Sequence, residues 1–232
     1  VKQELNEITS GRIGLAIWTD ANSPIPDSYS ANPGAFAEYV VPLTDQTTVV
    51  AGIRGDSVNT NVTDDPAKLA ALGLEMPQHS LDQILGTDAY DQSFSLWSSF
   101  LTLKHEVNDD WTFGSSFGYA QRPPNLTELY AAQTFMFLIQ NGLNTVTGDP
   151  TLAPEKLLQL DLGLDYDNGQ TRAGIRGFHA WARDYITLEA TRTFTTAQLE
   201  QVSLQYVNTD LATLAGGEMY FESDVNNWLT PF

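Results

Sequence analysis

Acidic and basic side chains alternate with apolar ones in the segment LLQLDLGLDYDNGQTRAGIRGFHAW, at residues 157–181. Asp161 and Asp165 precede an Asn-Gly dipeptide in this segment. Arg172 and Arg176 follow the dipeptide at the same spacing. Because Asn-Gly is a strong signal for a β-hairpin, these acidic and basic side chains should meet across paired strands. The chemistry that this pattern predicts is ion pairing, or contact with other polar groups, on one face of a sheet.

The sequence carries none of the residue patterns that mark the common catalytic and metal sites. It has no cysteine and only three histidines, which stand far apart. The G-x-S-x-G, phosphate-loop and H-E-x-x-H patterns are absent. The 29 acidic residues outnumber the 11 basic ones and give a formal charge of -18, whereas nucleic-acid surfaces need clustered Lys and Arg. We therefore predict no enzyme activity, no metal site, no cofactor and no nucleic-acid partner.

The elements that must position the charged residues are strands with one apolar and one polar face. A hairpin with Asp167 opposite Gln170 places Leu162 opposite Ile175 on the apolar face, since successive side chains switch faces. On the other face, this register predicts ion pairs of Asp161 with Arg176 and of Asp165 with Arg172.

Two further hairpins segregate polarity in the same way. One has a three-residue loop at 108–110, and the other turns at 44–46. The apolar pairs that they predict are Leu101 with Phe117, Leu103 with Ser115, Tyr39 with Ala51, and Ala37 with Ile53. A final strand at about 205–225 places Met219 and Phe221 on one side and its acidic residues on the other.

Short and long connections alternate along the chain if the first strand is placed at 8–18. The short ones lie at 44–46, 108–110, 168–169 and 226–227, and the long ones at 20–34, 59–92, 123–155 and 188–204. We predict an all-β fold, an antiparallel up-and-down meander of about eight strands that forms part of a large transmembrane β-barrel. Its short turns lie at one end and its long loops at the other. A soluble β-sandwich or lipocalin-like barrel also alternates, and periodicity alone leaves open which face is inside.

Two sets of residues are candidates for binding. The first consists of charged residues on the polar faces, which would line the lumen of a barrel or pair with one another: Arg54, Asp161, Asp165, Arg172, Arg176, Asp184, Glu218, Glu222 and Asp224. The second consists of cationic and aromatic residues in the long loops, which would contact a ligand at the outer mouth or pack the loop against its neighbours: Arg122, Tyr130, Phe135, Met136, Phe137 and Arg192.

The segment RPPNLTELY, at residues 122–130, joins a strand end to a helix start. Two prolines remove hydrogen-bond donors and end the strand. Asn125 can then cap a helix whose third position is Glu128, in an arrangement like a capping box. The segment GDPTLAPE, at residues 148–155, follows in the same long loop.

These two segments resemble the R-x-P-N-x-x-E-L-Y/F and G-N-P-x-L-x-P-E motifs of the TonB-dependent receptors of bacterial outer membranes. The departures are Pro123, where the family often has Ala, and Asp149, where it often has Asn. The resemblance implies a barrel of roughly 22 strands with a plugged lumen. It also implies energy-dependent import of a scarce nutrient, such as siderophore-bound iron, cobalamin, a metal or a glycan.

On this resemblance, the expected partners are outer-membrane lipid, the protein's own plug domain, TonB and an unidentified small-molecule ligand. Residues 1–232 are then expected to be an internal part of the barrel domain, without the plug and the final strands. A passive porin or adhesin barrel and a soluble β-barrel binding module are the alternative functions.

Overall fold

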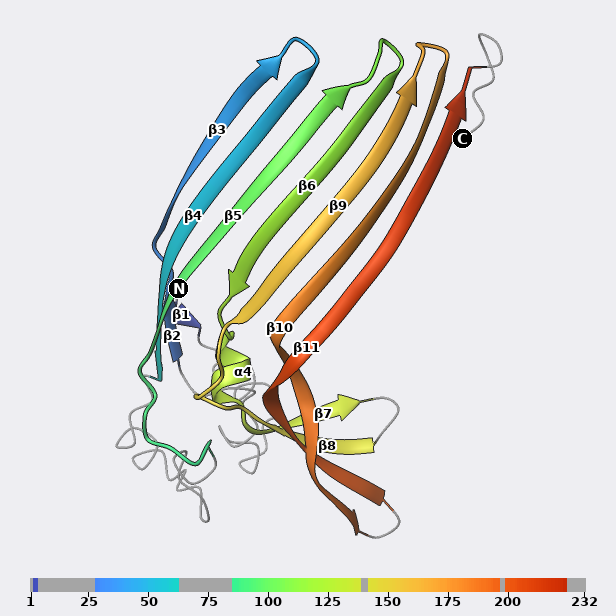
Figure 1. The fold of residues 1–232 in the computed structure, drawn as a ribbon. Coiled ribbons are helices and arrows are strands. Elements are labelled where there is room, and N and C mark those ends of the chain that lie inside the picture. The colour runs from blue at the N-terminus through green and yellow to red at the C-terminus, as the bar shows by residue number, and fades with distance from the viewer. Residues whose placement is uncertain (1, 4–27, 63–84, 139–141, 197–198, 225–232) are drawn as a thin grey trace.

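The computed structural model describes residues 2–3, 28–62, 85–138, 142–196 and 199–224, which form one sheet with a short helix (Figure 1). The strand order is β1-β2-β4-β5-β6-β9-β10-β11-β8-β7, and β3 also pairs with β4. The elements are β1 Lys2–Gln3, β2 Ser28–Ala31, β3 Gly34–Thr44, β4 Thr47–Val62, β5 Gln92–Glu106, β6 Trp111–Arg122, α4 Leu126–Tyr130, β7 Ala132–Leu138, β8 Gly142–Thr147, β9 Glu155–Asp167, β10 Thr171–Thr196 and β11 Leu199–Ser223. The expected strand at 8–18 and turn at 226–227 lie outside the described residues.

The strands β3, β4, β5, β6, β9, β10 and β11 form a continuous antiparallel wall. Tight turns join them at one end, and the long connections lie at the other (Figure 1). Each of these strands has at least 11 residues, whereas crossing a bilayer at a tilt takes about 9–11. The predicted meander is confirmed for this wall, and the alternation of turns and loops is confirmed as far as β10.

Two of the three predicted hairpin registers are confirmed. Tyr39 pairs with Ala51 across the turn between β3 and β4. Leu101 pairs with Phe117 across the turn between β5 and β6. In both hairpins the alternation of apolar residues sets the pairing, because a slip by one residue would move every side chain to the opposite face.

The predicted register of the β9–β10 hairpin is wrong by two residues. Asp167 pairs with Arg172, and Leu164 rather than Leu162 lies opposite Ile175. The turn centres on Gly169 and the following glutamine, with Gly169 at a φ of 81°. The Asn168 side chain closes this turn, because its Oδ1 accepts hydrogen bonds from the backbone N–H groups of Gln170 and Thr171. Since the slip is even, every residue keeps its predicted face.

The predicted long loop at 188–204 is also wrong. The strands β10 and β11 stay paired as far as Thr196 and Leu199. Residues 189–198, EATRTFTTAQ, contain four threonines, whose β-branched side chains favour strands without providing an apolar face. The strand β8 then pairs with β11 in parallel, and β7 pairs with β8, so the loop end of the sheet departs from a pure meander.

One face of the wall is apolar and open. This apolar face carries Leu101, Phe117, Leu162, Ile175 and Met219, all of which are exposed. Leu162 keeps 49% of its surface accessible and Met219 keeps 81%. The described residues therefore place no second protein layer over this face. The opposite side, here called the polar face, carries Thr102, Ser116, Asp161, Arg176 and Glu218 among others.

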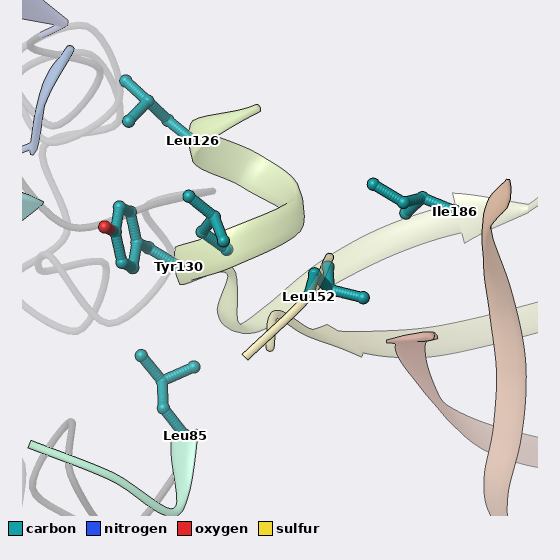
Figure 2. Close-up of a cluster of buried hydrophobic side chains, with 6 residues drawn as sticks. Leu85, Leu126, Tyr130, Leu152 and Ile186 are labelled. Atoms are coloured by element: carbon teal, nitrogen blue, oxygen red, sulfur yellow. The ribbon is translucent and has the colours of Figure 1, made fainter. Parts of the chain in front are cut away.

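A small apolar cluster covers the loop end of the polar face (Figure 2). It consists of Leu85, Leu126, Leu129, Tyr130, Leu152 and Ile186, with Val62, Tyr90, Phe94 and Tyr206 packed against it. Within the wall, Ile186, Phe94 and Tyr206 stand at positions that alternate with the apolar face. The helix α4 therefore folds over the polar side of the sheet. No helix among the described residues is long and apolar enough to cross a membrane.

Candidate functional site

The helix α4 begins with the capping box that its sequence predicts. The backbone N–H of Glu128 donates to Asn125 Oδ1 at 2.9 Å, and the backbone N–H of Asn125 donates to Glu128 Oε2 at 2.7 Å. These bonds satisfy donors that a helix start otherwise leaves free. A helix of one turn is unstable by itself, so the cap and the contacts below must hold it.

Arg122 connects the cap of α4 to the start of β9. Its Nε donates to Glu155 Oε2 at 2.6 Å, and its Nη1 donates to Glu128 Oε2 at 2.9 Å. The hydrogen bond with Glu155 is the main reason that the pKa of Arg122 lies above its ordinary value. Burial raises the pKa of Glu155, but the hydrogen bonds from Arg122 and from the backbone N–H of Ile186 outweigh burial and hold it below its ordinary value.

The GDPTLAPE segment pairs directly with the end of α4. The backbone N–H of Gly148 donates to Ala131 O at 2.7 Å, and that of Asp149 donates to Glu128 O at 2.9 Å. A Cβ on Gly148 would lie 2.5 Å from Leu129 O, so only glycine permits this approach. The two sequence motifs therefore form one unit, here called the loop base.

Tyr130 anchors the loop base on the wall. The side chain is fully buried, and its hydroxyl donates to Tyr90 O at 2.6 Å. The same hydroxyl lies 2.8 Å from Thr60 Oγ1 on β4. Burial raises the pKa of Tyr130 above its ordinary value. A hydroxyl with two partners in a dry site fixes the helix in one position, because an unpaired alternative is costly.

Asn208 of β11 joins the other side of the loop base to the wall. Its Oδ1 accepts from the backbone N–H of Ala153 at 2.8 Å, and its Nδ2 donates to Ala153 O at 3.0 Å. Nδ2 also donates to Asp184 O at 2.6 Å. Together with Tyr130, these bonds attach the base to strands on both sides of β6 and β9.

The polar face below the loop base is hollowed. A shallow hollow of about 640 Å³ lies where small residues leave room, among them Gly114, Ser116 and Gly163. Arg176 and Asp161 also line it, and Arg176 Nη2 lies 3.2 Å from Asp165 Oδ1. Two further hollows lie over other polar-face residues of the same wall. This face thus offers charged and hydrogen-bonding groups around open space.

A family model described as TonB dependent receptor-like, beta-barrel matches residues 6–230. The chain belongs to this receptor family. Its relatives are outer-membrane β-barrel proteins of Gram-negative bacteria, and the family consists of transport receptors rather than enzymes. A comparison with curated proteins gave no match.

Solved structures of receptor barrels share the fold at low sequence identity. The copper transporter OprC is 22% identical, with a TM-score of 0.64 over 87% of this chain and 28% of its own. The hemophore receptor HasR of Serratia marcescens, a double mutant bound to its hemophore HasA and heme, is 15% identical, with a TM-score of 0.60 over 87% of this chain and 33% of its own. The FrpB iron transporter of Neisseria meningitidis (F5-1 variant, apoprotein form) is 17% identical, with a TM-score of 0.55 over 87% of this chain and 25% of its own. The chain spans about a quarter to a third of these structures.

The receptor wall brings most of the predicted lumen residues onto its polar face. Arg54 pairs with Asp56 at 2.6 Å, and Arg172 lies 3.4 Å from Asp167. The predicted ion pairs Asp161–Arg176 and Asp165–Arg172 are wrong because of the register slip described above. The remaining members of the set are placed on β11 (Glu218 and Glu222), just after it (Asp224), and at the loop end of β10 (Asp184). That these residues line a lumen stays a prediction.

The loop candidates separate into two groups. Arg122 and Tyr130 belong to the loop base, where their polar atoms already have protein partners. Phe135, Met136 and Phe137 lie in β7, and Arg192 lies in β10, in parts where only the backbone is described. Ligand contact by all six stays a prediction. Sequence reasoning missed Asn208 and Thr60, since neither stands in a motif. Within the described part of the receptor, no group of three or more His, Cys, Asp or Glu is placed to hold a metal ion.

Proposed function

We propose that this chain forms part of the barrel wall of a TonB-dependent outer-membrane receptor that imports a scarce nutrient. Siderophore-bound iron, cobalamin, a metal or a glycan are the substrate classes. The match to the receptor barrel family over residues 6–230 is the observation that carries the proposal. A plug domain and the TonB protein complete the importer in this proposal.

We propose further that the apolar face meets lipid and the polar face meets the lumen. Hydrocarbon requires a surface without charge, and the exposed leucine, phenylalanine and methionine side chains of the apolar face provide it. The hollows and most of the ion pairs lie on the opposite face. The loop base covers the end of that face, which supports its position at the mouth of the lumen.

Cysteine accessibility in the full-length receptor tests this orientation. Leu162 and Ile175 are the lipid-facing positions, and Asp161 and Arg176 are the lumen-facing positions. No native cysteine in this chain interferes with the labelling. A water-soluble maleimide should label cysteines at the two charged positions and spare those at the two apolar ones. Equal labelling of all four would contradict the orientation.

Uptake measurements test the import function. Cells that express the full-length receptor should accumulate one ligand from a panel of labelled iron–siderophore complexes, cobalamin, copper, heme and oligosaccharides. Removal of TonB should abolish that accumulation, because energy coupling distinguishes an importer from a passive pore. Uptake that persists at the same rate without TonB would instead support the porin alternative.

A further inference from the structure

The apolar face of the wall carries charge at only one place. Between the tight turns and residue 185 of β10, strands β3–β6 and β9–β11 place two charged side chains on it, Lys156 and Arg183. Both are cationic, and strand alternation assigns no Asp or Glu in that part of the wall to this face, although the Asp184 carboxylate reaches Lys156 Nζ at 2.6 Å. In a chain with 29 acidic and 11 basic residues, two neighbouring cations with a single carboxylate beside them depart from the acidic composition of the rest.

The two cations are direct neighbours. Arg183 pairs with Lys156 across β9 and β10, and Gln121 lies opposite Lys156 on the other side. Arg183 is exposed, and the Lys156 side chain keeps 42% of its surface accessible. Gln121, Lys156 and Arg183 therefore form one row across three strands, on the apolar side of the sheet.

The pair lies where the apolar band should end. At the turn end, the rings of Trp111 and Tyr166 are 4.9 Å apart. From Tyr166 to Lys156 the strand advances by ten residues, which is about 33 Å along the strand and about 25 Å along the membrane normal at a tilt of about 40°. The apolar band of outer-membrane barrels is also about 25 Å tall. Lys156 and Arg183 thus reach the level of the lipid headgroups on the loop side.

Aromatic side chains flank the pair at the same level. Tyr119 and Trp181 stand one row closer to the membrane centre, on either side of Leu158. The Trp97 ring lies 4.4 Å from the ring of Tyr119. Such aromatic belts mark the boundary between hydrocarbon and headgroups. A soluble anion would have to enter this boundary to reach the cations, whereas a lipid headgroup already occupies it.

We propose that Lys156 and Arg183 bind phosphate groups of a phosphorylated lipid headgroup in the outer leaflet. The proposal rests on the orientation given under the proposed function. The guanidinium of Arg183 can take a phosphate through two parallel N–H donors, and the ammonium of Lys156 adds a point charge. Asp184 Oδ2 holds Lys156 Nζ at 2.6 Å, which leaves the other N–H donors of the ammonium group for the lipid.

Retention of diphosphorylated lipid A by the purified full-length receptor tests the site. Native mass spectrometry in detergent measures the lipid affinity of the K156Q/R183Q double variant against the parent. At about fivefold for each cation near a membrane surface, the affinity should fall about 25-fold. Dephosphorylated lipid A should bind the parent and the variant equally. The control is Lys104→Gln, which removes an exposed cation of the polar face and should leave lipid affinity unchanged.

For a second variant we expect a higher lipid affinity instead of a lower one. Asp184→Asn removes the acidic group beside Lys156 and should strengthen lipid A binding. Asn suits the left-handed backbone of this position, where φ is 55°, so the fold should persist.

The proposal is overturned by an unchanged affinity in K156Q/R183Q or by an equal loss in Lys104→Gln. Displacement of the lipid by millimolar inorganic phosphate would also overturn it, because the site would then be one for soluble anions. Labelling of a cysteine at position 162 distinguishes a failure of the headgroup site from a failure of the orientation. A water-accessible Leu162 position contradicts the orientation itself, whereas a protected one with unchanged lipid affinity contradicts only the headgroup site.

Discussion

Replacement of Gly148 by alanine should separate the two halves of the loop base. The new Cβ would lie 2.5 Å from Leu129 O and 2.7 Å from the backbone nitrogen of Ala131. Ordinary contacts at such positions are 3.4–4 Å, so the segments must move apart by about 1 Å. Because the opposing atoms are backbone, no side-chain rotation can relieve the overlap.

The movement should break two hydrogen bonds. Gly148 N–H to Ala131 O and Asp149 N–H to Glu128 O measure 2.7 and 2.9 Å, and both lie at the point of overlap. A net contribution of about 0.5–1.5 kcal/mol for each gives about 1–3 kcal/mol for the local contact. Local opening should therefore become about 5- to 150-fold more frequent, since tenfold corresponds to about 1.4 kcal/mol.

Hydrogen exchange of the full-length receptor in detergent micelles measures this opening at residues 126–131 and 148–152. The control is Gly114→Ala on the polar face, where an added Cβ meets nothing within 4 Å. That variant should exchange like the parent. If both variants exchange at the parent's rate, then the close backbone approach is not what fixes the loop base, and the reasoning is refuted.

Two further substitutions test the polar contacts of the loop base. Glu155→Gln should weaken the bond to Arg122, which is partly exposed, by about 1 kcal/mol. Because the pKa of Glu155 lies below its ordinary value of 4.5, its contribution is present above pH 4.5 and is lost as the pH falls through the lowered pKa. Exchange at α4 should accordingly rise on acidification in the parent more than in this variant, and parallel pH profiles would contradict the assignment. Tyr130→Phe leaves Tyr90 O and Thr60 without their hydroxyl partner and should lower the unfolding free energy by about 1–3 kcal/mol. Urea unfolding measures that loss, and an unchanged midpoint would contradict it.

Alternation and turn chemistry predicted the strands of the wall and two of its three hairpin registers. The pairing of Tyr39 with Ala51 and of Leu101 with Phe117 follows from which residues must share the apolar face. The same rule could not place the β9–β10 turn, because a slip by two residues preserves every face. In that hairpin the Asn168 side chain sets the register, because its hydrogen bonds close a turn that is centred one residue later than the Asn-Gly signal suggests.

The loop end was less predictable for a different physical reason. Residues 189–198 include only one large apolar side chain, Phe194, so hydrophobicity gave little indication that β10 continues to Thr196. The capping box at Asn125 was predictable because its bonds are local in sequence. The contacts of Tyr130 with Thr60 and of Asn208 with Ala153 join segments far apart in the chain, and no spacing encodes them.

The parallel pairing of β8 with β11 joins the β6–β9 connection to the β10–β11 hairpin by backbone hydrogen bonds. The strand β8 belongs in sequence to the connection between β6 and β9, yet it bonds to the hairpin formed by β10 and β11 (Figure 1). An insertion or deletion in either connection therefore alters the edge on which the other is built. A chimera that exchanges surface segments between barrels of this kind should transfer residues 123–154 together with the distal part of the β10–β11 hairpin, because each half alone would meet a foreign edge.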